Sequence, residues 1–223
     1  MDQLPHGYTN FTRSAAGQVH KTYDGPRRWD NARRELVCLK ALGQHLPIAT
    51  VVEYDLAVPS MTLSLLPGRH GQDLIEEGHA PQVLRLVGAT LARLQSFAPW
   101  IVDGLDGTGP VIVHGDFGPQ NMLFDLTADR VTGVVDWESA HIGSPIEDLA
   151  WTEWLVRMHH PEAVDALDDL FAAAQFGPSW SERQAAMVRQ IQDLIAYCES
   201  AEMTASALEW RDRLRRTEGW TAE

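Results

Sequence analysis

The stretch HGDFGPQNMLFD, His114 to Asp125, and the segment VTGVVDWE that follows it, Val131 to Glu138, decide the fold of this chain. A short apolar run, Val111–Val113, leads into the first stretch, and the apolar pair at 134–135 leads into the acidic end of the second. Short apolar runs bounded by polar and turn-forming residues are typical of strands that end in loops. Loops fixed by strands are where chemical groups are commonly held.

Two strands joined by a turn are predicted within these segments, at 121–125 and 130–135. A hairpin of this length brings its two open ends together. Asp116, Asn121 and Asp136 are therefore expected to converge although they are scattered in the sequence. Two carboxylates and one amide would then face a single point.

This set of side chains suits phosphoryl transfer. Oxygen ligands bind hard cations such as Mg²⁺, which takes one or two protein carboxylates and completes its shell with phosphate oxygens and water. A carboxylate that does not bind the metal is able to accept a proton from a hydroxyl. Turn caps and strand ends would explain each residue on its own, so the indication comes from the combination and its order.

The run His-x-Asp-x-x-x-x-Asn, followed by an apolar strand and Asp-Trp-Glu, resembles the catalytic segment of the aminoglycoside phosphotransferase and choline kinase families, relatives of the protein kinases. The resemblance implies an α+β, bilobal protein-kinase-like fold with a small β-rich N-terminal lobe and a larger, mainly helical C-terminal lobe. It also implies that Asp116 is the catalytic base and that Asn121 and Asp136 bind Mg²⁺.

Two further features of this segment follow from the resemblance. Gly115 and Trp137-Glu138 stand where protein kinases have Arg and Phe-Gly, which disfavours a peptide substrate. His114, at a strand end, is expected to be a hydrogen-bonded scaffold without a catalytic role. By the same resemblance, Asp148 is expected to brace the catalytic loop.

An ion pair between Lys21 and Glu35 is predicted near the N-terminus. Gln18–Tyr23 alternates in the manner of a strand and places Lys21 beside apolar neighbours, and Glu35 lies toward the buried edge of a helix predicted at 27–43. Each charge needs a partner, and the two would satisfy each other. A surface lysine and a solvated glutamate are the alternative. In kinases the corresponding pair anchors the nucleotide phosphates.

Two other groups of residues are candidates for nucleotide contacts. Gly7, Thr9 and Asn10 precede the first alternating run and match the place of a phosphate-covering loop, although an N-terminal turn explains them as well. Leu65 and Leu66 precede a Pro-Gly pair, where the families that this chain resembles have the linker that meets the nucleotide base. Burial in the core is the alternative for these leucines.

The resemblance predicts a nucleotide-binding lobe at 1–66 and a catalytic, substrate-binding lobe at 67–223. The second lobe should contain helices with clear apolar stripes or capping signals. Their expected ranges are 81–97, 146–159, 163–176 and 181–200.

Composition excludes several classes of protein. The 223 residues are 44% apolar, enough for a sizeable core, and carry a formal net charge of −13, which opposes binding to nucleic acid or anionic membranes. No stretch approaches the roughly 20 apolar residues of a membrane span, and the first residues lack the layout of a secretory signal, so a cytoplasmic location is expected. Cys38 and Cys198 lie in apolar helical patterns and are expected to be buried thiols.

The predicted function is transfer of the ATP γ-phosphoryl group, with GTP as an alternative donor, to a hydroxyl of a small cationic acceptor that is aminoglycoside- or choline-like. The acidic composition and three tryptophans of the second lobe, Trp137, Trp151 and Trp154, favour an amine, although core burial explains the tryptophans equally well. Two other functions remain open. One is a nucleotide-binding pseudokinase, and the other is a metal-dependent phosphohydrolase with His114, Asp116 and Asp136 as ligands. The latter leaves Lys21 and Asn121 unexplained.

Overall fold

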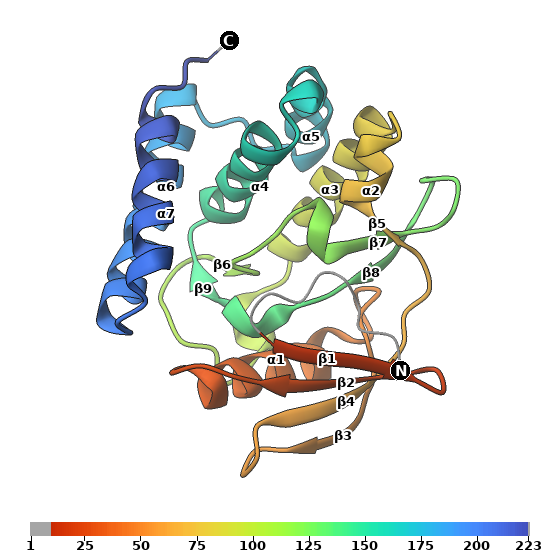
Figure 1. The fold of residues 1–223 in the computed structure, drawn as a ribbon. Coiled ribbons are helices and arrows are strands. Elements are labelled where there is room, and N and C mark those ends of the chain that lie inside the picture. The colour runs from red at the N-terminus through yellow and green to blue at the C-terminus, as the bar shows by residue number, and fades with distance from the viewer. Residues whose placement is uncertain (1–9, 223) are drawn as a thin grey trace.

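The small lobe is built on a four-stranded antiparallel sheet in the order β1-β2-β4-β3, with helix α1 packed against it (Figure 1). The structure is a computed structural model and describes residues 10–222. The elements of this lobe are β1 (Asn10–Ala15), β2 (Gln18–Tyr23), α1 (Arg28–Leu42), β3 (Val51–Asp55) and β4 (Ser60–Ser64). The strand predicted at 18–23 and the helix predicted at 27–43 are confirmed.

The hairpin predicted from the sequence lies at the centre of the molecule. It is formed by β7 (Met122–Phe124) and β8 (Val131–Val134), and β7 also pairs with the short strand β5 (Arg69–His70). The run at 111–113 is strand β6 (Val111–Val113), which pairs with β9 (His141–Gly143). Both small sheets lie between the four-stranded sheet and the helices of the large lobe (Figure 1).

Helices make up most of the large lobe, and α6 and α7 run side by side along one flank of it (Figure 1). The α-helices are α2 (Gly71–Glu76), α3 (Ala80–Gln95), α4 (Ile146–His159), α5 (Leu167–Ala174), α6 (Trp180–Ser200) and α7 (Thr204–Glu218). Four short 3₁₀ segments lie between the helices and strands of the described chain, namely η1 (Pro99–Ile101), η2 (Pro119–Asn121), η3 (Trp137–Ser139) and η4 (Pro161–Ala166).

One predicted helix differs from the structure. The range 163–176 is divided between η4 and α5, and the α-helix begins only at Leu167. Asp168 and Asp169 lie in the first turn of α5, where acidic side chains interact favourably with the helix dipole. The two aspartates thus favour a helix that begins at Leu167, a boundary that the spacing of apolar residues alone does not indicate.

Two apolar clusters form the core. The larger cluster is continuous from the small lobe, where it includes Tyr23 and Leu36, through to α3 and the catalytic segment. A second cluster joins α4 to α6 through residues such as Trp154 and Ile191, with side chains of α7 packed against it. Cys38 and Cys198 are buried and free, as predicted.

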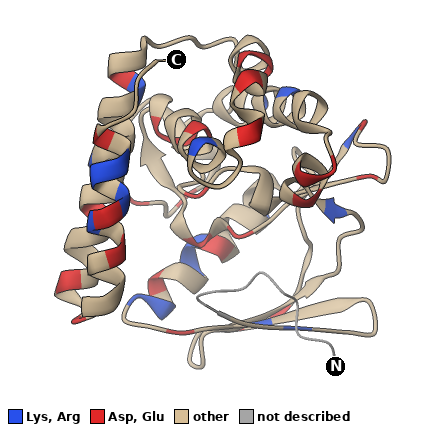
Figure 2. Cartoon of the chain, turned by 45° about the horizontal axis from the view of Figure 1, so that its top comes forward, with Lys and Arg blue, Asp and Glu red and all other residues tan. Residues whose placement is uncertain are grey.

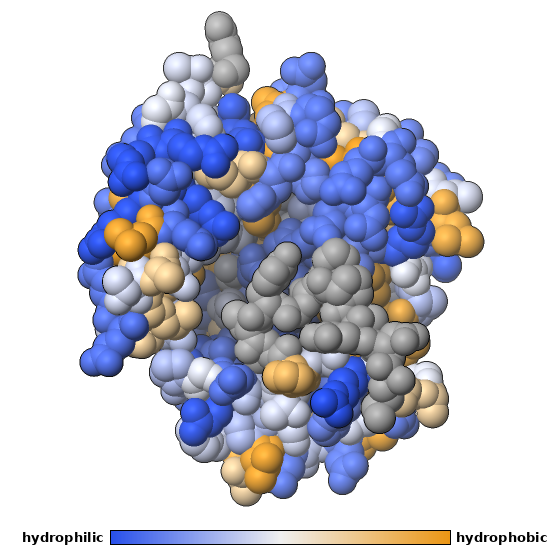
Figure 3. Space-filling view, viewed as in Figure 1, coloured by the Kyte–Doolittle hydropathy of each residue, from blue (hydrophilic) through white to orange (hydrophobic). Residues whose placement is uncertain are grey.

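The surface is mostly polar. Acidic and basic residues are interleaved on α6 and α7 (Figure 2). On the face shown in Figure 3, apolar side chains stand singly or in small groups among hydrophilic ones. Within residues 10–222, none of the helices has the length and apolar character that crossing a membrane requires.

Gly88 determines how closely α3 and α5 approach each other. A Cβ atom at this position would lie 2.3 Å from the backbone oxygen of Leu170 and 3.0 Å from the backbone nitrogen of Ala174. Real Cβ atoms do not approach backbone so closely, so any larger residue forces the helices apart. The packing of α3 against α5 therefore depends on this glycine.

Gly88→Ala should lower the free energy of unfolding by roughly 1–2 kcal/mol, because overpacking costs about 1–3 kcal/mol and the gain in helix propensity is at most about 1 kcal/mol. Urea denaturation would measure the change. Gly177→Ala is the matched control, since a Cβ atom there meets nothing within 4 Å. Equal loss of stability in both variants would show that the close approach of α3 and α5 at Gly88 is not the cause of the loss.

Candidate active site

Asp116 is held by donors on both of its carboxylate oxygens. Trp151 donates its indole N–H to Oδ1 at 2.8 Å, and Gln120 donates to the same oxygen at 3.3 Å. Asn121 donates its amide N–H to Oδ2 at 2.8 Å and to the backbone oxygen of Asp116 at 2.9 Å. The predicted convergence of Asp116 with Asn121 is therefore present.

The pKa of Asp116 is raised to about 7. Burial is the main cause, and the nearby carboxylates of Asp136 and Glu138 act in the same direction, while the hydrogen bonds from Trp151 and Asn121 oppose the shift. A carboxylate with a pKa near neutrality is suited to accepting and releasing a proton at physiological pH.

Asp148 fixes the start of the catalytic loop from below, as predicted. Its two carboxylate oxygens accept hydrogen bonds from the backbone N–H groups of His114 at 2.7 Å and of Gly115 at 2.9 Å. Burial raises the pKa of Asp148 to about 6 against the lowering effect of these two bonds. Gly115 has φ +84°, and a Cβ atom there would lie 2.5 Å from the backbone oxygen of Ser139, so only glycine fits.

His114 is a neutral, buried scaffold. Its Nε2 lies 3.0 Å from the backbone oxygen of Val135, and its Nδ1 accepts the backbone N–H of Asp116 at 3.3 Å. Only the neutral ring with its proton on Nε2 makes both bonds. The rings of Phe117 and Trp137 pack against it, and burial lowers its pKa to about 4. Since both nitrogens are engaged, the geometry does not support His114 as a metal ligand, which the phosphohydrolase alternative requires.

The predicted ion pair between Lys21 and Glu35 is present, with 2.6 Å between Nζ and Oε2. The same ammonium lies 2.6 Å from Oδ1 of Asp136 and 3.6 Å from Oε2 of Glu138. Lys21 is only 7% exposed, and although burial lowers its pKa, the three carboxylates outweigh that effect and raise it above the usual range. Tyr23 supports the pair by donating its hydroxyl to Oε2 of Glu35 at 2.6 Å.

Asp136 occupies a left-handed backbone conformation, with φ 68° and ψ 60°, two residues beyond the end of β8. Few non-glycine residues adopt this conformation, and aspartate is among those that tolerate it. Burial raises the pKa of Asp136, but the adjacent Lys21 outweighs burial and holds it below the ordinary value. The carboxylate is therefore ionised and directed at the lysine.

The donor set fits a hard cation. Glu35, Asp136 and Glu138 each offer a carboxylate oxygen, and the three atoms lie within 4.8 Å of one another. The amide nitrogen of Asn121 is committed to Asp116, which leaves its amide oxygen as the group able to bind metal. Carboxylate and amide oxygens are the ligands that Mg²⁺ prefers, so the predicted pair Asn121 and Asp136 has suitable chemistry, with Glu138 as a further donor.

The predicted nucleotide contacts are only partly described. Gly7 and Thr9 lie outside the described residues, and Asn10 begins β1. Leu65 is exposed and donates its backbone N–H to Gly17 at 3.0 Å, whereas Leu66 is half-buried against the core.

A tight linker follows these leucines. Gly68 has φ +136°, and a Cβ atom on it would lie 2.6 Å from the backbone oxygen of Phe124. Only glycine allows the linker to pass this close to the β7–β8 hairpin.

The tryptophans predicted to attract an amine lie in the core. Trp137, Trp151 and Trp154 are 0%, 6% and 1% exposed. Glu153, an acidic residue of the same helix as Trp151 and Trp154, is fully buried and paired with Arg157 at 2.9 Å and Arg183 at 2.6 Å. The hypothesis that these tryptophans offer open faces to a cation is wrong, because Trp151 and Trp154 of α4 pack against α6 and α7, and Trp137 of η3 lies in the larger cluster.

Three contacts of the site, made by Tyr23, Gln120 and Trp151, were not predicted. Tyr23 shares a strand face with Lys21, and that alternation could have indicated its contact with the buried pair. Gln120 lies next to Asn121 in the loop, but a glutamine in a loop gives no signal of its own. The bond from Trp151 to Asp116 depends on how α4 packs under the loop, which no local pattern reveals.

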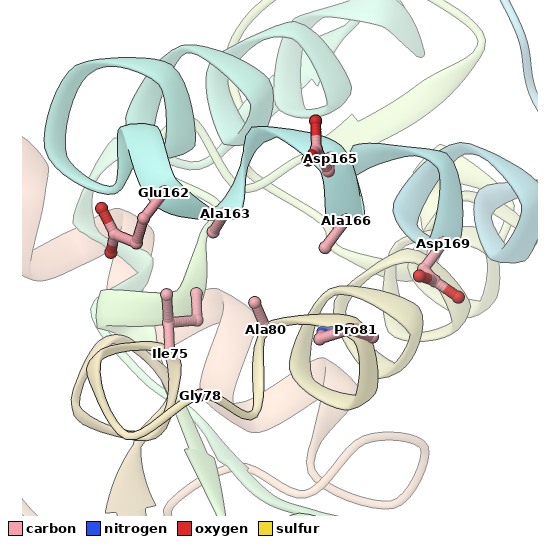
Figure 4. A pocket seen from close by; sticks show the side chains of 9 residues that line it. All are labelled: Ile75, Gly78, Ala80, Pro81, Glu162, Ala163, Asp165, Ala166 and Asp169. Carbon is pink, nitrogen blue, oxygen red and sulfur yellow. The ribbon is translucent and has the colours of Figure 1, made fainter.

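Two cavities lie apart from these groups. One of about 310 Å³ lies between α2–α3 and η4–α5, where Ile75, Ala80 and Ala166 face the space and acidic residues stand at its rim (Figure 4). The other, of about 520 Å³, lies where β9 and α4 meet the start of α6. Neither is lined by Asp116, Asn121 or Asp136, so neither belongs to the candidate active site.

Comparison with known proteins connects this geometry to a family. A sequence model of the family described as "Phosphotransferase enzyme family" matches residues 103–186, which contain the catalytic loop and α4. Viomycin phosphotransferase of Streptomyces vinaceus is 46% identical over 51 residues, which are 22% of this chain and 18% of that protein. Acyl-CoA dehydrogenase family member 11 of Gallus gallus is 37% identical over 63 residues, 27% of this chain and 8% of that protein. The matched region thus spans less than a fifth of the length of either relative.

The fold is similar to that of solved phosphotransferases. The GDP complex of wild-type aminoglycoside 2'-phosphotransferase-IIIa aligns with a TM-score of 0.77 at 13% identity, over 97% of this chain and 91% of that one. This likeness confirms the predicted α+β, bilobal kinase-like fold. Together with the matched catalytic segment, it confirms the resemblance to the aminoglycoside phosphotransferase family.

The buried neutral ring of His114 makes stability depend on pH. Its pKa is about 4 in the folded protein against an ordinary 6.5, so the unfolded chain binds the proton more tightly and stability is lost as pH falls from 6.5 toward 4. The loss attributable to this ring is roughly 3 kcal/mol. His114→Gln, which cannot titrate, should lack this part of the pH dependence.

Urea denaturation of both proteins at several pH values would test this. Asp148 acts in the opposite direction, because its raised pKa favours the folded state at low pH, but it is present in both proteins and cancels in the difference. Parallel stability curves for the two proteins between pH 6.5 and 4 would contradict the assignment of a neutral His114.

Proposed function

We propose that this protein is a small-molecule kinase that transfers the γ-phosphoryl group of ATP, or of GTP, to a hydroxyl of a small acceptor. The observation that carries the proposal is the arrangement around Asp116. A carboxylate with a near-neutral pKa lies beside the amide of Asn121 and near a second, ionised carboxylate, Asp136, that a buried lysine contacts. This combination in a kinase-like fold supports phosphoryl transfer better than hydrolysis or binding alone.

Asp116 is the proposed base. Its carboxylate accepts the proton of the acceptor hydroxyl, whose oxygen forms a bond to the γ-phosphorus while the bond between that phosphorus and the β,γ-bridging oxygen breaks. The products are the phosphorylated acceptor and the nucleoside diphosphate. The pKa of about 7 allows the carboxylate to be ionised before the reaction and to release the proton afterwards.

Lys21 is the proposed phosphate-binding cation. It is fixed by Glu35, which is itself fixed by Tyr23, so its ammonium is held in place before the nucleotide arrives. Asn121 and Asp136 would hold Mg²⁺, which when bound neutralises charge on the phosphates. Glu138, whose Oε2 lies 3.6 Å from the Lys21 ammonium, is the next carboxylate able to bind the metal.

The remaining nucleotide contacts are proposed by position. Leu65 and Leu66 precede the linker and would meet the base, and Gly7, Thr9 and Asn10 would cover the phosphates. In this proposal the lobe formed by residues 1–66 binds the nucleotide, and the lobe formed by residues 67–223 carries out catalysis and binds the acceptor.

The proposed acceptor is a hydroxyl-bearing cation, aminoglycoside- or choline-like. The net charge of −13 favours approach of amines, and the solved structure with the TM-score quoted above is an aminoglycoside phosphotransferase. With the tryptophans buried, attraction by the acidic surface remains as the physical support. A cytoplasmic location fits this substrate class and the nucleotide supply.

A nucleotide-consumption screen tests the function. Mg·ATP and Mg·GTP are each combined with aminoglycosides, choline-like amines, neutral sugars and amino acids, and formation of nucleoside diphosphate is followed. Turnover with cationic acceptors, weakening as salt concentration rises, is the expected result. Turnover with neutral acceptors only would contradict the cationic class, and no turnover with any acceptor would contradict the proposed reaction.

Asp116→Asn should lower turnover by roughly 10²–10⁴, because it removes the proton acceptor while preserving size. Nucleotide affinity should change little, since Asp116 is not proposed to touch the nucleotide. Steady-state kinetics and calorimetry measure the two quantities. Wild-type turnover in this variant would remove Asp116 from the mechanism.

Asp136→Ala should abolish the Mg²⁺-dependent part of nucleotide binding, because the phosphates lose their metal-mediated link to the protein. Titration calorimetry with ADP, in the presence of Mg²⁺ or of a chelator, measures this dependence. Asp129→Ala is the charge-matched control, since Asp129 is exposed in the hairpin turn. If Mg²⁺ dependence survives in Asp136→Ala, another residue holds the metal and Glu138 is the next to test.

A further inference from the structure

We infer that Trp151 of α4 is a positioning residue that fixes the carboxylate plane of Asp116 through its indole N–H. The inference rests on the proposed function, because it assumes that Asp116 is the base. Its starting point is the 2.8 Å bond from Nε1 of Trp151 to Oδ1 of Asp116. This bond joins the cluster between α4 and α6, to which Trp151 belongs, directly to the carboxylate of Asp116.

The carboxylate needs such a partner to have one orientation. The torsion that turns an aspartate carboxylate is broad, so one hydrogen bond leaves it free to rotate. Asn121 holds Oδ2 at 2.8 Å and Trp151 holds Oδ1 at 2.8 Å, and two short bonds on the two oxygens together define the plane. Gln120 approaches Oδ1 only to 3.3 Å and is the weaker partner of that oxygen.

The indole is itself held rigidly. Its ring stacks on Trp154 with 4.6 Å between centroids and an interplanar angle of 11°, and Trp210 of α7 packs at 6.1 Å. The next residue, Thr152, donates its hydroxyl to the backbone oxygen of Phe117 at 2.8 Å, which ties α4 to the catalytic loop. A donor on a fixed ring, carried by a helix bonded to the loop, sets the position of Oδ1 more firmly than a flexible glutamine does.

A purely structural role would explain the same bond, because a buried indole N–H requires an acceptor. The two explanations differ in what the loss of the N–H does. If the bond only satisfies the indole, removing the N–H changes stability alone. If it positions the base, turnover falls while nucleotide binding is unaffected, since misorientation of a reacting group slows the chemical step.

Trp151→Phe and Trp180→Phe separate these roles in the 223-residue chain. Both replace an indole of the α4–α6 cluster by a smaller aromatic ring, but Trp180 lies at the start of α6 beside Arg157 and Arg183, and it neither stacks on Trp151 nor donates to Asp116. The readouts are kcat and nucleotide KM for Mg·ATP with the acceptor found in the screen, and the melting temperature.

Trp151→Phe should lower kcat by roughly 10- to 100-fold with nucleotide KM unchanged within about twofold. Trp180→Phe should lower the melting temperature, because it removes part of a half-buried ring of the same cluster, and should retain kcat within about threefold. Wild-type kcat in Trp151→Phe, or equal losses of kcat in both variants, would overturn the inference.

The outcome also distinguishes this inference from the proposed function. Loss of turnover in Asp116→Asn together with full turnover in Trp151→Phe would leave the base in place and remove only the positioning role. Absence of turnover in the wild-type protein with both Mg·ATP and Mg·GTP would remove the proposed function and the inference together. Full turnover in Asp116→Asn would likewise overturn the inference, since there would be no base to position.

Discussion

One buried ammonium holds the two lobes in register at the site. Lys21 comes from β2 of the small lobe, and its partners Asp136 and Glu138 come from the segment after β8, 115 or more residues further along the chain. With Glu35 included, three carboxylates surround one ammonium, a formal balance of three negative charges against one positive. Buried charge of this kind is stable only when compensated. The unequal balance supports a second cation as part of the working site.

The position of the loop that carries Asp116 depends on hydrogen bonds from backbone N–H groups and not on a counterion. Asp148 accepts two of them and holds the turn at Gly115, while the neutral ring of His114 contacts the backbone beyond the end of β8. Both residues are fully buried. The loop is therefore positioned by a neutral ring and by a carboxylate whose oxygens are satisfied by backbone N–H groups, without a counterion from the lysine–carboxylate cluster.

The sequence predicted what local chemistry determines. The Lys21–Glu35 pair was predictable because each charge lay on an otherwise apolar face, and β2 and α4 were predictable because their patterns are strong. The contact between Asp116 and Asn121 was predictable from their order in the loop that precedes the hairpin. Contacts that depend on helix packing were not predictable, since spacing along α4 does not say whether Trp151 meets solvent, core or loop. Nucleotide roles for Leu65 and Leu66 remain predictions.

Each of the two apolar clusters supports a different part of the site. The larger cluster runs from the small lobe to the catalytic segment and fixes the lysine side, whereas the cluster of α4 and α6, with α7 packed on it, lies behind Asp116. Asn121 on the loop and Trp151 on α4 hold opposite oxygens of the same carboxylate. The geometry of the Asp116 carboxylate, the proposed base, is thus set where the two clusters meet. A change in the packing of α6 and α7 would shift α4 and therefore the position of the Trp151 indole. The orientation of the Asp116 carboxylate thus depends on the helices that flank the large lobe.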